Sequence, residues 1–144
     1  MSSFTRPLST TQLKPRWWRV DEGFRYYVGA KGSDYYFDVE AGFEYDGGSI
    51  PRFAWWLDAP NGDGAQAYCL HDALYGSGLV PRAEADRILD EGLAVKGLSA
   101  FRRGLIYSTV RAVGWLFFKK RDIKERCDHA KTYVTMHGGP YQKV

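Results

Sequence analysis

The pattern of apolar side chains changes at about residue 63, and this change constrains the fold more than any other feature. Before it, short runs rich in aromatic and β-branched residues occur at 16–20, 24–28 and 35–39, with a fourth candidate at 43–46. Turn sequences separate these runs, as is typical of β-strands. After it, apolar residues recur at helical spacing. Strands first and helices second predict an α+β fold, with a small antiparallel β-sheet in the N-terminal half and three to four helices in the C-terminal half.

Capping residues set the expected bounds of the first two helices. Asp63 is the expected N-cap of a helix over 65–75, which Gly76 would end. Pro81 suits the first turn of a second helix over 82–96.

Two more helices are expected before the end of the chain. Ser99 can cap a helix that runs to about residue 120, and Asp122 with Glu125 has the spacing of a capping box for a fourth helix. The length of 144 residues suits one domain. We expect this domain to span residues 1–136, with residues 137–144 as a C-terminal tail.

Charge is distributed unevenly along the chain. The formal net charge is +3, yet residues 97–126 carry eight basic and two acidic side chains. Such a segment suits an anionic partner, which could be a phospholipid or membrane surface, an acidic protein face or, less expected, nucleic acid. A solvated helix face is the alternative interpretation. The sequence does not indicate an oligomeric state.

Two cysteines in 144 residues fit a protein that folds in a reducing compartment. The N-terminus has no apolar segment of the kind found in secretory signals. Arginines interrupt the apolar stretch at 101–118, so we expect no transmembrane segment.

One histidine stands out because of its neighbours. His71 and Tyr75 are four residues apart and share a face of the first predicted helix. The short link to the second helix favours antiparallel neighbours, which would bring Asp86 close to His71. A carboxylate that orients an imidazole makes it a general base. We therefore predict a catalytic set of His71, Tyr75 and Asp86.

Asp72 would then be a candidate ligand for a cation. Calcium takes six to eight oxygen ligands, which commonly include backbone carbonyls. The turn that contains Tyr45, Gly47 and Gly48 could supply these carbonyls, since glycine lets the backbone approach closely. A structural interpretation stays open beside this one, in which His71, Asp72 and Asp86 form a buried polar network that fixes the helix pair.

Other chemistries fit the sequence less well. A phosphohydrolase site of the His…His-Asp…Asp type needs a histidine before His71, and none precedes it. Cys69, His71 and Asp72 are too close together for a good zinc set. There is no glycine-rich phosphate loop, and Ser49 does not lie in a nucleophile elbow.

Four segments together resemble an uncharacterised family of tailed phages and prophages, domain-of-unknown-function family 1353. They are YDGGSIPR at 45–52, YCLHDALY at 68–75, RAEADRILDEGL at 82–93, and the long helix that follows. The resemblance covers roughly residues 35–118. It implies a phage or prophage origin and no established activity.

The site alone also resembles the secreted phospholipases A2, which carry a His-Asp-x-Cys-Tyr helix. In that family the histidine activates a water molecule, the next aspartate binds calcium, and the tyrosine and a second-helix aspartate hold the histidine. Carried over, these roles fall on His71, Asp72, Tyr75 and Asp86. Leu74 stands where that family has a cysteine, and Cys69 does not match its cysteine positions.

Two classes of function follow. The first is a calcium-dependent lipid ester hydrolase, for which Trp115, Phe117 and Phe118 beside a basic helix end would suit an anionic membrane surface. The second is a non-enzymatic phage virion or assembly protein, of a tail or baseplate, whose His-Asp network is structural and whose partners would be other phage structural proteins. Either would occur in the bacterial cytoplasm during phage production or in the virion.

Overall fold

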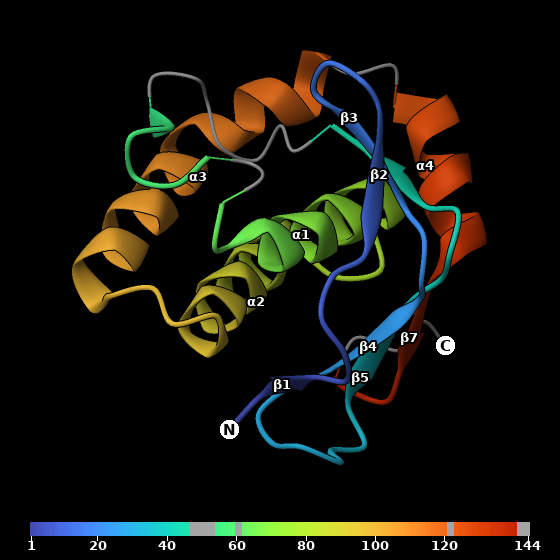
Figure 1. Ribbon diagram of the computed structural model, residues 1–144, viewed down its shortest axis with the longest axis horizontal. Coiled ribbons are helices and arrows are strands. Elements are labelled where there is room, and N and C mark those ends of the chain that lie inside the picture. The colour runs from blue at the N-terminus through green and yellow to red at the C-terminus, as the bar shows by residue number, and fades with distance from the viewer. Residues whose placement is uncertain (47–53, 60–61, 121–122, 141–144) are drawn as a thin grey trace.

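Seven short strands and four helices occur in the described part of the computed structural model, residues 1–46, 54–59, 62–120 and 123–140 (Figure 1). Of residues 114–120 and 123–127 only the backbone is described. The helices are α1 (Ala65–Ser77), α2 (Arg82–Val95), α3 (Ala100–Lys120) and α4 (Ile123–Tyr133). The predicted α+β class is confirmed, and the four helices agree with the three to four predicted for the C-terminal half.

The strands form two antiparallel sheets in place of the one predicted. The larger sheet has the order β1 (Ser3–Phe4), β4 (Phe24–Tyr27), β5 (Tyr36–Val39) and β7 (Val134–His137). The smaller sheet has the order β2 (Thr10–Lys14), β3 (Trp17–Val20) and β6 (Glu44–Tyr45).

The predicted strand segments correspond to β3, β4, β5 and β6. Three strands were not predicted. β1 has two residues and β2 is polar and mostly exposed, so neither shows an alternating apolar pattern.

β7 connects the C-terminal end of the chain to the N-terminal sheet. It follows α4 directly and pairs with β5, where Val134 lies opposite Val39 and Met136 opposite Phe37. The strand extends to His137, the first residue of the predicted tail. Residues 141–144 lie outside the described part of the chain.

The predicted caps of α1 are wrong at both ends. Its N-cap is Gly64, and Asp58 rather than Asp63 accepts the N–H of Gly64, at 2.9 Å. The helix runs past Gly76 to a left-handed Gly78, whose φ is 64°. Gly76 can continue the helix because the left-handed cap that glycine favours is available two residues later.

The caps of the other helices are mostly as predicted. Pro81 is the N-cap of α2, and Gly97 follows its C-cap with a φ of 89°. Ser99 accepts the N–H of Arg102 at the start of α3, at 3.3 Å. The predicted capping box of Asp122 and Glu125 falls outside the residues whose side chains are described.

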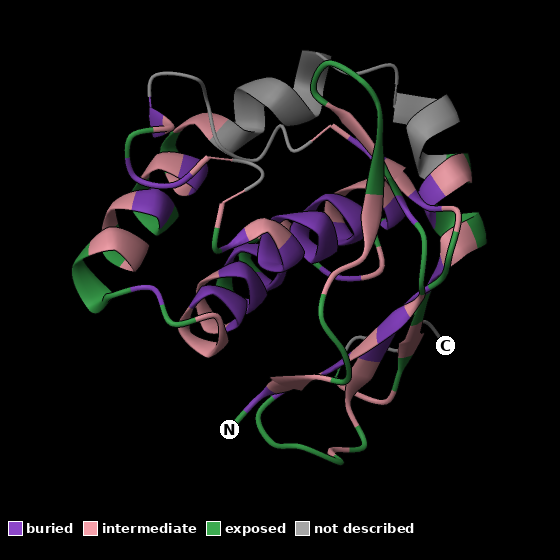
Figure 2. Cartoon of the chain, in the orientation of Figure 1, coloured by how far each residue is buried: buried purple, intermediate pink, exposed green. Residues whose placement is uncertain are grey.

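α1 lies at the centre of the fold and is the most buried helix described. Ten of its thirteen residues are buried (Figure 2). It packs against α2 and α4 and contacts strands β6 and β7. A helix that is covered on all sides has apolar residues around its whole circumference, as α1 does. The few polar side chains on α1 must therefore find partners inside the protein.

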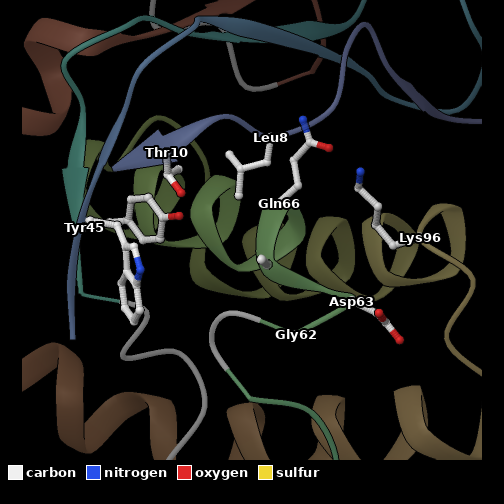
Figure 3. Close-up of a pocket in the computed structure, with 9 residues that line it drawn as sticks. Leu8, Thr10, Tyr45, Gly62, Asp63, Gln66 and Lys96 are labelled. Atoms are coloured by element: carbon white, nitrogen blue, oxygen red, sulfur yellow. The ribbon is translucent and has the colours of Figure 1, made fainter. Parts of the chain in front are cut away.

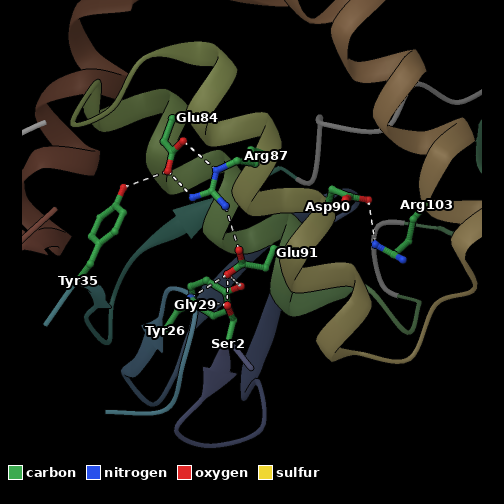
Figure 4. Close-up of polar contacts among 9 residues, drawn as sticks. All are labelled: Ser2, Tyr26, Gly29, Tyr35, Glu84, Arg87, Asp90, Glu91 and Arg103. Carbon is green, nitrogen blue, oxygen red and sulfur yellow. Dashed lines mark hydrogen bonds and ion pairs between the residues drawn. The ribbon is translucent and has the colours of Figure 1, made fainter. Parts of the chain in front are cut away.

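Two glutamates tie α2 to the larger sheet (Figure 4). Glu91 accepts hydrogen bonds from the hydroxyl groups of Ser2 and Tyr26, with the Tyr26 oxygen at 2.8 Å, and from the N–H of Gly29 at 3.3 Å. Arg87 bridges Glu91, at 3.0 Å, and Glu84. These contacts fix the position of α2 relative to the strands.

No helix in the described ranges is long and apolar enough to cross a membrane.

Replacing Glu91 by alanine should lower the free energy of unfolding by about 2–3 kcal/mol, because several donors lose a charged acceptor. Replacing its neighbour Asp90, whose ion pair with Arg103 is more exposed, should cost less than about 1 kcal/mol. Urea unfolding of both variants measures the difference. Equal losses would show that Glu91 does not hold α2 to the sheet.

Candidate functional site

The Asp86 carboxylate is the centre of a buried polar network that joins three helices. Its Oδ1 lies 2.7 Å from His71 Nε2 of α1 and accepts a hydrogen bond from the Tyr75 hydroxyl, also of α1. Its Oδ2 accepts a hydrogen bond from Arg111 of α3 at 2.9 Å. The predicted approach of Asp86 to His71 and Tyr75 is therefore present.

The contacts of Asp86 with α1 can be predicted from the sequence, because they depend on the spacing of residues within α1 and on the short link to α2. His71 and Tyr75 share a face, and their rings lie 4.0 Å apart between centroids. Residues 78–81 are a short link, so α2 packs directly on α1. Asp86 lies in the second turn of α2, where this packing turns it toward His71.

Two arginines of the network were not predicted to belong to it. Arg111 donates to Asp86 from the middle of α3. Arg82 lies one turn before Asp86, with Nε 4.0 Å from Oδ2, and its guanidinium also donates to the carbonyl of Arg111 at 2.6 Å. Arg111 is a basic side chain within the apolar segment at 101–118, and a charge in such a segment needs a partner. The sequence therefore contained a signal that Arg111 pairs with an acidic residue.

The surroundings of Asp86 favour its ionised form. Burial alone would raise the pKa of this carboxyl, but hydrogen bonds from His71, Tyr75 and Arg111 outweigh that effect and hold its pKa below the ordinary value. Burial, together with the same carboxylate, raises the pKa of Tyr75, so the phenol stays protonated and donates. An ionised Asp86 requires a proton on His71 Nε2, because a carboxylate only accepts.

His71 is the only buried histidine of the three in the sequence. The side chains of His71 and Asp86 have no exposed surface. His129 accepts the N–H of Glu44 at 2.9 Å, and His137 lies beside Asp38 and stacks on Tyr36. Among the histidines, the buried carboxylate partner thus distinguishes His71.

Asp72 and Tyr45, two of the predicted metal ligands, lie near one another. Asp72 is buried, and its charge helps to raise the pKa values of Tyr45 and Cys69, although burial is the larger cause for both. Cys69 and Thr10 are polar neighbours of the Tyr45 hydroxyl. The other two predicted ligands, Gly47 and Gly48, lie outside the described residues.

The described residues supply few ligands for a metal. Among them, no group of three or more histidine, cysteine, aspartate or glutamate side chains could hold an ion. Asp72 provides one carboxylate beside β6, the strand that leads toward residues 47 and 48. A calcium ion at this position would depend on backbone carbonyls for most of its six to eight oxygens.

A family model described as "Protein of unknown function (DUF1353)" matches residues 18–110. The chain belongs to the DUF1353 family. The matched part includes His71, Tyr75 and Asp86, and it ends one residue before Arg111. No curated protein and no solved structure matches this DUF1353 chain.

The free energy that Asp86 contributes should disappear at acidic pH. Because its folded-state pKa is below the ordinary value of 3.8, this contribution is fully present above that pH and is lost as the pH falls through the folded-state pKa. At neutral pH, Asp86→Asn should cost about 3 kcal/mol or more, since His71 and Arg111 lose a buried charge partner. The cost should shrink below about pH 4.

Urea unfolding between pH 3 and 7 measures this cost, with Asp90→Asn as the control one turn later on α2. Tyr75→Phe provides a milder test and should cost about 1 kcal/mol, the value of one hydrogen bond. A pH-independent cost for Asp86→Asn would contradict the ionised state of Asp86.

Proposed function

We propose that this protein is an ester hydrolase in which His71 acts as the general base. The observation that carries the proposal is the 2.7 Å contact between His71 Nε2 and Asp86. With a proton held at Nε2, the basic lone pair of the neutral ring is on Nδ1. In the proposed reaction, Nδ1 removes a proton from water as the water attacks the ester carbonyl, and Asp86 stabilises the charged imidazole. The imidazole then returns this proton to the ester oxygen as its bond to the carbonyl carbon breaks, and the fatty acid and the alcohol are released.

The substrate class comes from the resemblance to the secreted phospholipases A2, and we propose a phospholipid ester. In those enzymes a tyrosine and a second-helix aspartate hold the histidine. Here Asp86 and Tyr75 stand in the corresponding relation to His71. Arg111 adds a positive charge that helps to keep Asp86 ionised.

We propose calcium as the metal, with Asp72 as its carboxylate ligand and the backbone of Tyr45, Gly47 and Gly48 as further ligands. When bound, calcium would polarise the ester carbonyl and stabilise the negative charge that develops on it. The position of Asp72 beside Tyr45 supports this choice. Asp72 follows His71 directly, so a metal at Asp72 would lie close to the general base.

We also propose a phage or prophage origin, on the resemblance of the four sequence segments to proteins of tailed phages. The protein would be made in the bacterial cytoplasm during phage production and could be carried in the virion. Its membrane contact would involve Trp115, Phe117 and Phe118, whose side chains fall outside the described residues.

Hydrolysis of mixed phospholipid vesicles, measured as fatty acid release, tests the proposal. His71→Ala should lower the rate by about 10²- to 10⁴-fold, the usual contribution of a general base. His137→Ala is the matched control, because that histidine lies in β7 outside the network, and it should keep the activity. A chelator should abolish the wild-type activity, and calcium should restore it.

Absence of chelator-sensitive hydrolysis in the wild-type protein, or full activity in His71→Ala, would refute the hydrolase. Circular dichroism of each variant separates a loss of catalysis from a loss of folding.

A second candidate is a non-enzymatic phage tail, baseplate or assembly protein, and the burial of the network favours it. The side chains of His71 and Asp86 have no exposed surface, and both oxygens of Asp86 are engaged. A purely structural role, in which the network fixes α1, α2 and α3 in one arrangement, is sufficient to explain these contacts.

Mass spectrometry of purified particles and assembly intermediates tests the second candidate. If the protein is structural, it should be present in them in stoichiometric amounts, and His71→Ala should impair assembly without any hydrolytic defect. Absence of the protein from every particle fraction would exclude this role.

A further inference from the structure

A cavity of about 310 Å³ lies beside the first turn of α1, under the smaller sheet (Figure 3). Thr10, Trp18 and Tyr45 contribute to its wall from β2, β3 and β6, and Gln66 and Lys96 contribute from the helical side. The volume is at the lower end of the range for small-molecule sites, about 300–1,000 Å³. The His71–Asp86 network does not line this cavity, so the two are separate features.

Lys96 provides a positive charge in the wall. It makes no ion pair with any residue in the described ranges, and its Nζ lies 5.0 Å from the centre of the Phe4 ring. Burial lowers the pKa of Lys96, which means that its charged form is less well solvated than in water. A negatively charged group in the cavity would offset this cost.

Gln66 provides an unsatisfied hydrogen-bond acceptor. Its side chain is buried, with 1% of the residue exposed, and Nε2 donates to the carbonyl of Arg6 at 2.9 Å. Oε1 has no hydrogen-bond partner among the described residues. Figure 3 shows the Gln66 carboxamide and the Lys96 ammonium extending on the same side of the cavity. A hydroxyl group suits such a pair, because it can accept from an ammonium and donate to a carbonyl oxygen.

The local field also favours an anion. The first turn of α1 contains no acidic residue, and the N-terminal end of a helix carries partial positive charge. Asp63 is the acidic residue in the wall, but it is exposed and its carboxylate points away from the cavity in Figure 3. Asp58, close to the helix start, is engaged by Gly64 and Tyr68 and lies 3.7 Å from Arg102.

We propose that this cavity binds a small molecule that carries both a negative charge and hydroxyl groups, as in a polyol phosphate. Lys96 and the α1 N-terminus would bind the anion, Gln66 would accept from a hydroxyl, and Trp18 would contact the carbon skeleton. This chemistry occurs in phospholipid headgroups and in soluble sugar phosphates. The site does not depend on the proposed hydrolase, because binding is measured without turnover.

NMR titration of the full chain, labelled with ¹⁵N, tests the proposal. Glycerol 3-phosphate and glucose 6-phosphate are the probes, and glycerol and inorganic phosphate are the comparators. At least one of the two probes should give saturable shifts at the indole N–H of Trp18 and the carboxamide of Gln66. Each comparator should bind that site about tenfold more weakly, since it offers one of the two recognised groups.

Lys96→Met keeps the length of the side chain, removes its charge, and should weaken binding of the probe about tenfold. Lys131→Met, an exposed lysine of α4, is the matched control and should leave the affinity unchanged. The wild-type titration is decisive by itself if Lys96→Met fails to fold.

Three results would overturn the proposal: no saturable shift with either probe, shifts that lie away from the cavity, or inorganic phosphate that binds as tightly as the probes.

Sedimentation with phosphatidylglycerol vesicles distinguishes the two sources of the ligand. Binding to vesicles that glycerol 3-phosphate competes away would assign the site to a lipid headgroup. If the vesicles do not displace the bound probe from the cavity in the NMR titration, the ligand is a soluble polyol phosphate.

Discussion

The carboxylate of Asp86 is the interaction on which the arrangement of the helices depends. It receives hydrogen bonds from His71 and Tyr75 of α1 and from Arg111 of α3, while its own backbone belongs to α2. A buried charge is costly unless donors surround it. Moving any one of the three helices would leave Asp86 with fewer donors in a site without water contact. The carboxylate therefore selects one packing arrangement of α1, α2 and α3, whatever net stability it contributes.

The opposite side of α2 is held against the larger sheet in a similar way, by hydrogen bonds to a carboxylate. Glu91, with Arg87 and Glu84, connects this helix to strands β1 and β4 through Ser2, Tyr26 and the following turn at Gly29. α2 is thus held by Asp86 on its helical side and by Glu91 on its sheet side. Because α2 is fixed from both sides, Asp86 has a defined position relative to the His71 ring. General base catalysis requires this fixed position, and a purely structural network would also produce it.

The burial of the site separates the two proposed functions. A hydrolase needs water and substrate to reach His71, whereas a structural network gains from the exclusion of water. Residues 47–53, which follow β6 and Tyr45, lie outside the described part of the chain, and the predicted ligands Gly47 and Gly48 are among them. A hydrolytic His71 must therefore gain contact with water, whereas a structural His71 must remain shielded from it.

Local sequence patterns determined the α+β class, four of the strands, the four helices and the pairing of His71 with Asp86, because each depends on spacing within one element or across one short link. Tertiary structure decided the rest. The cap of α1 comes from Asp58 because Gly64 has no side chain of its own, and β7 forms because β5 offers it an open edge. Arg111 joins Asp86, and Gln66 and Lys96 share a cavity, only because distant segments pack together. A one-dimensional pattern reports the period of an element, but not which element it will contact.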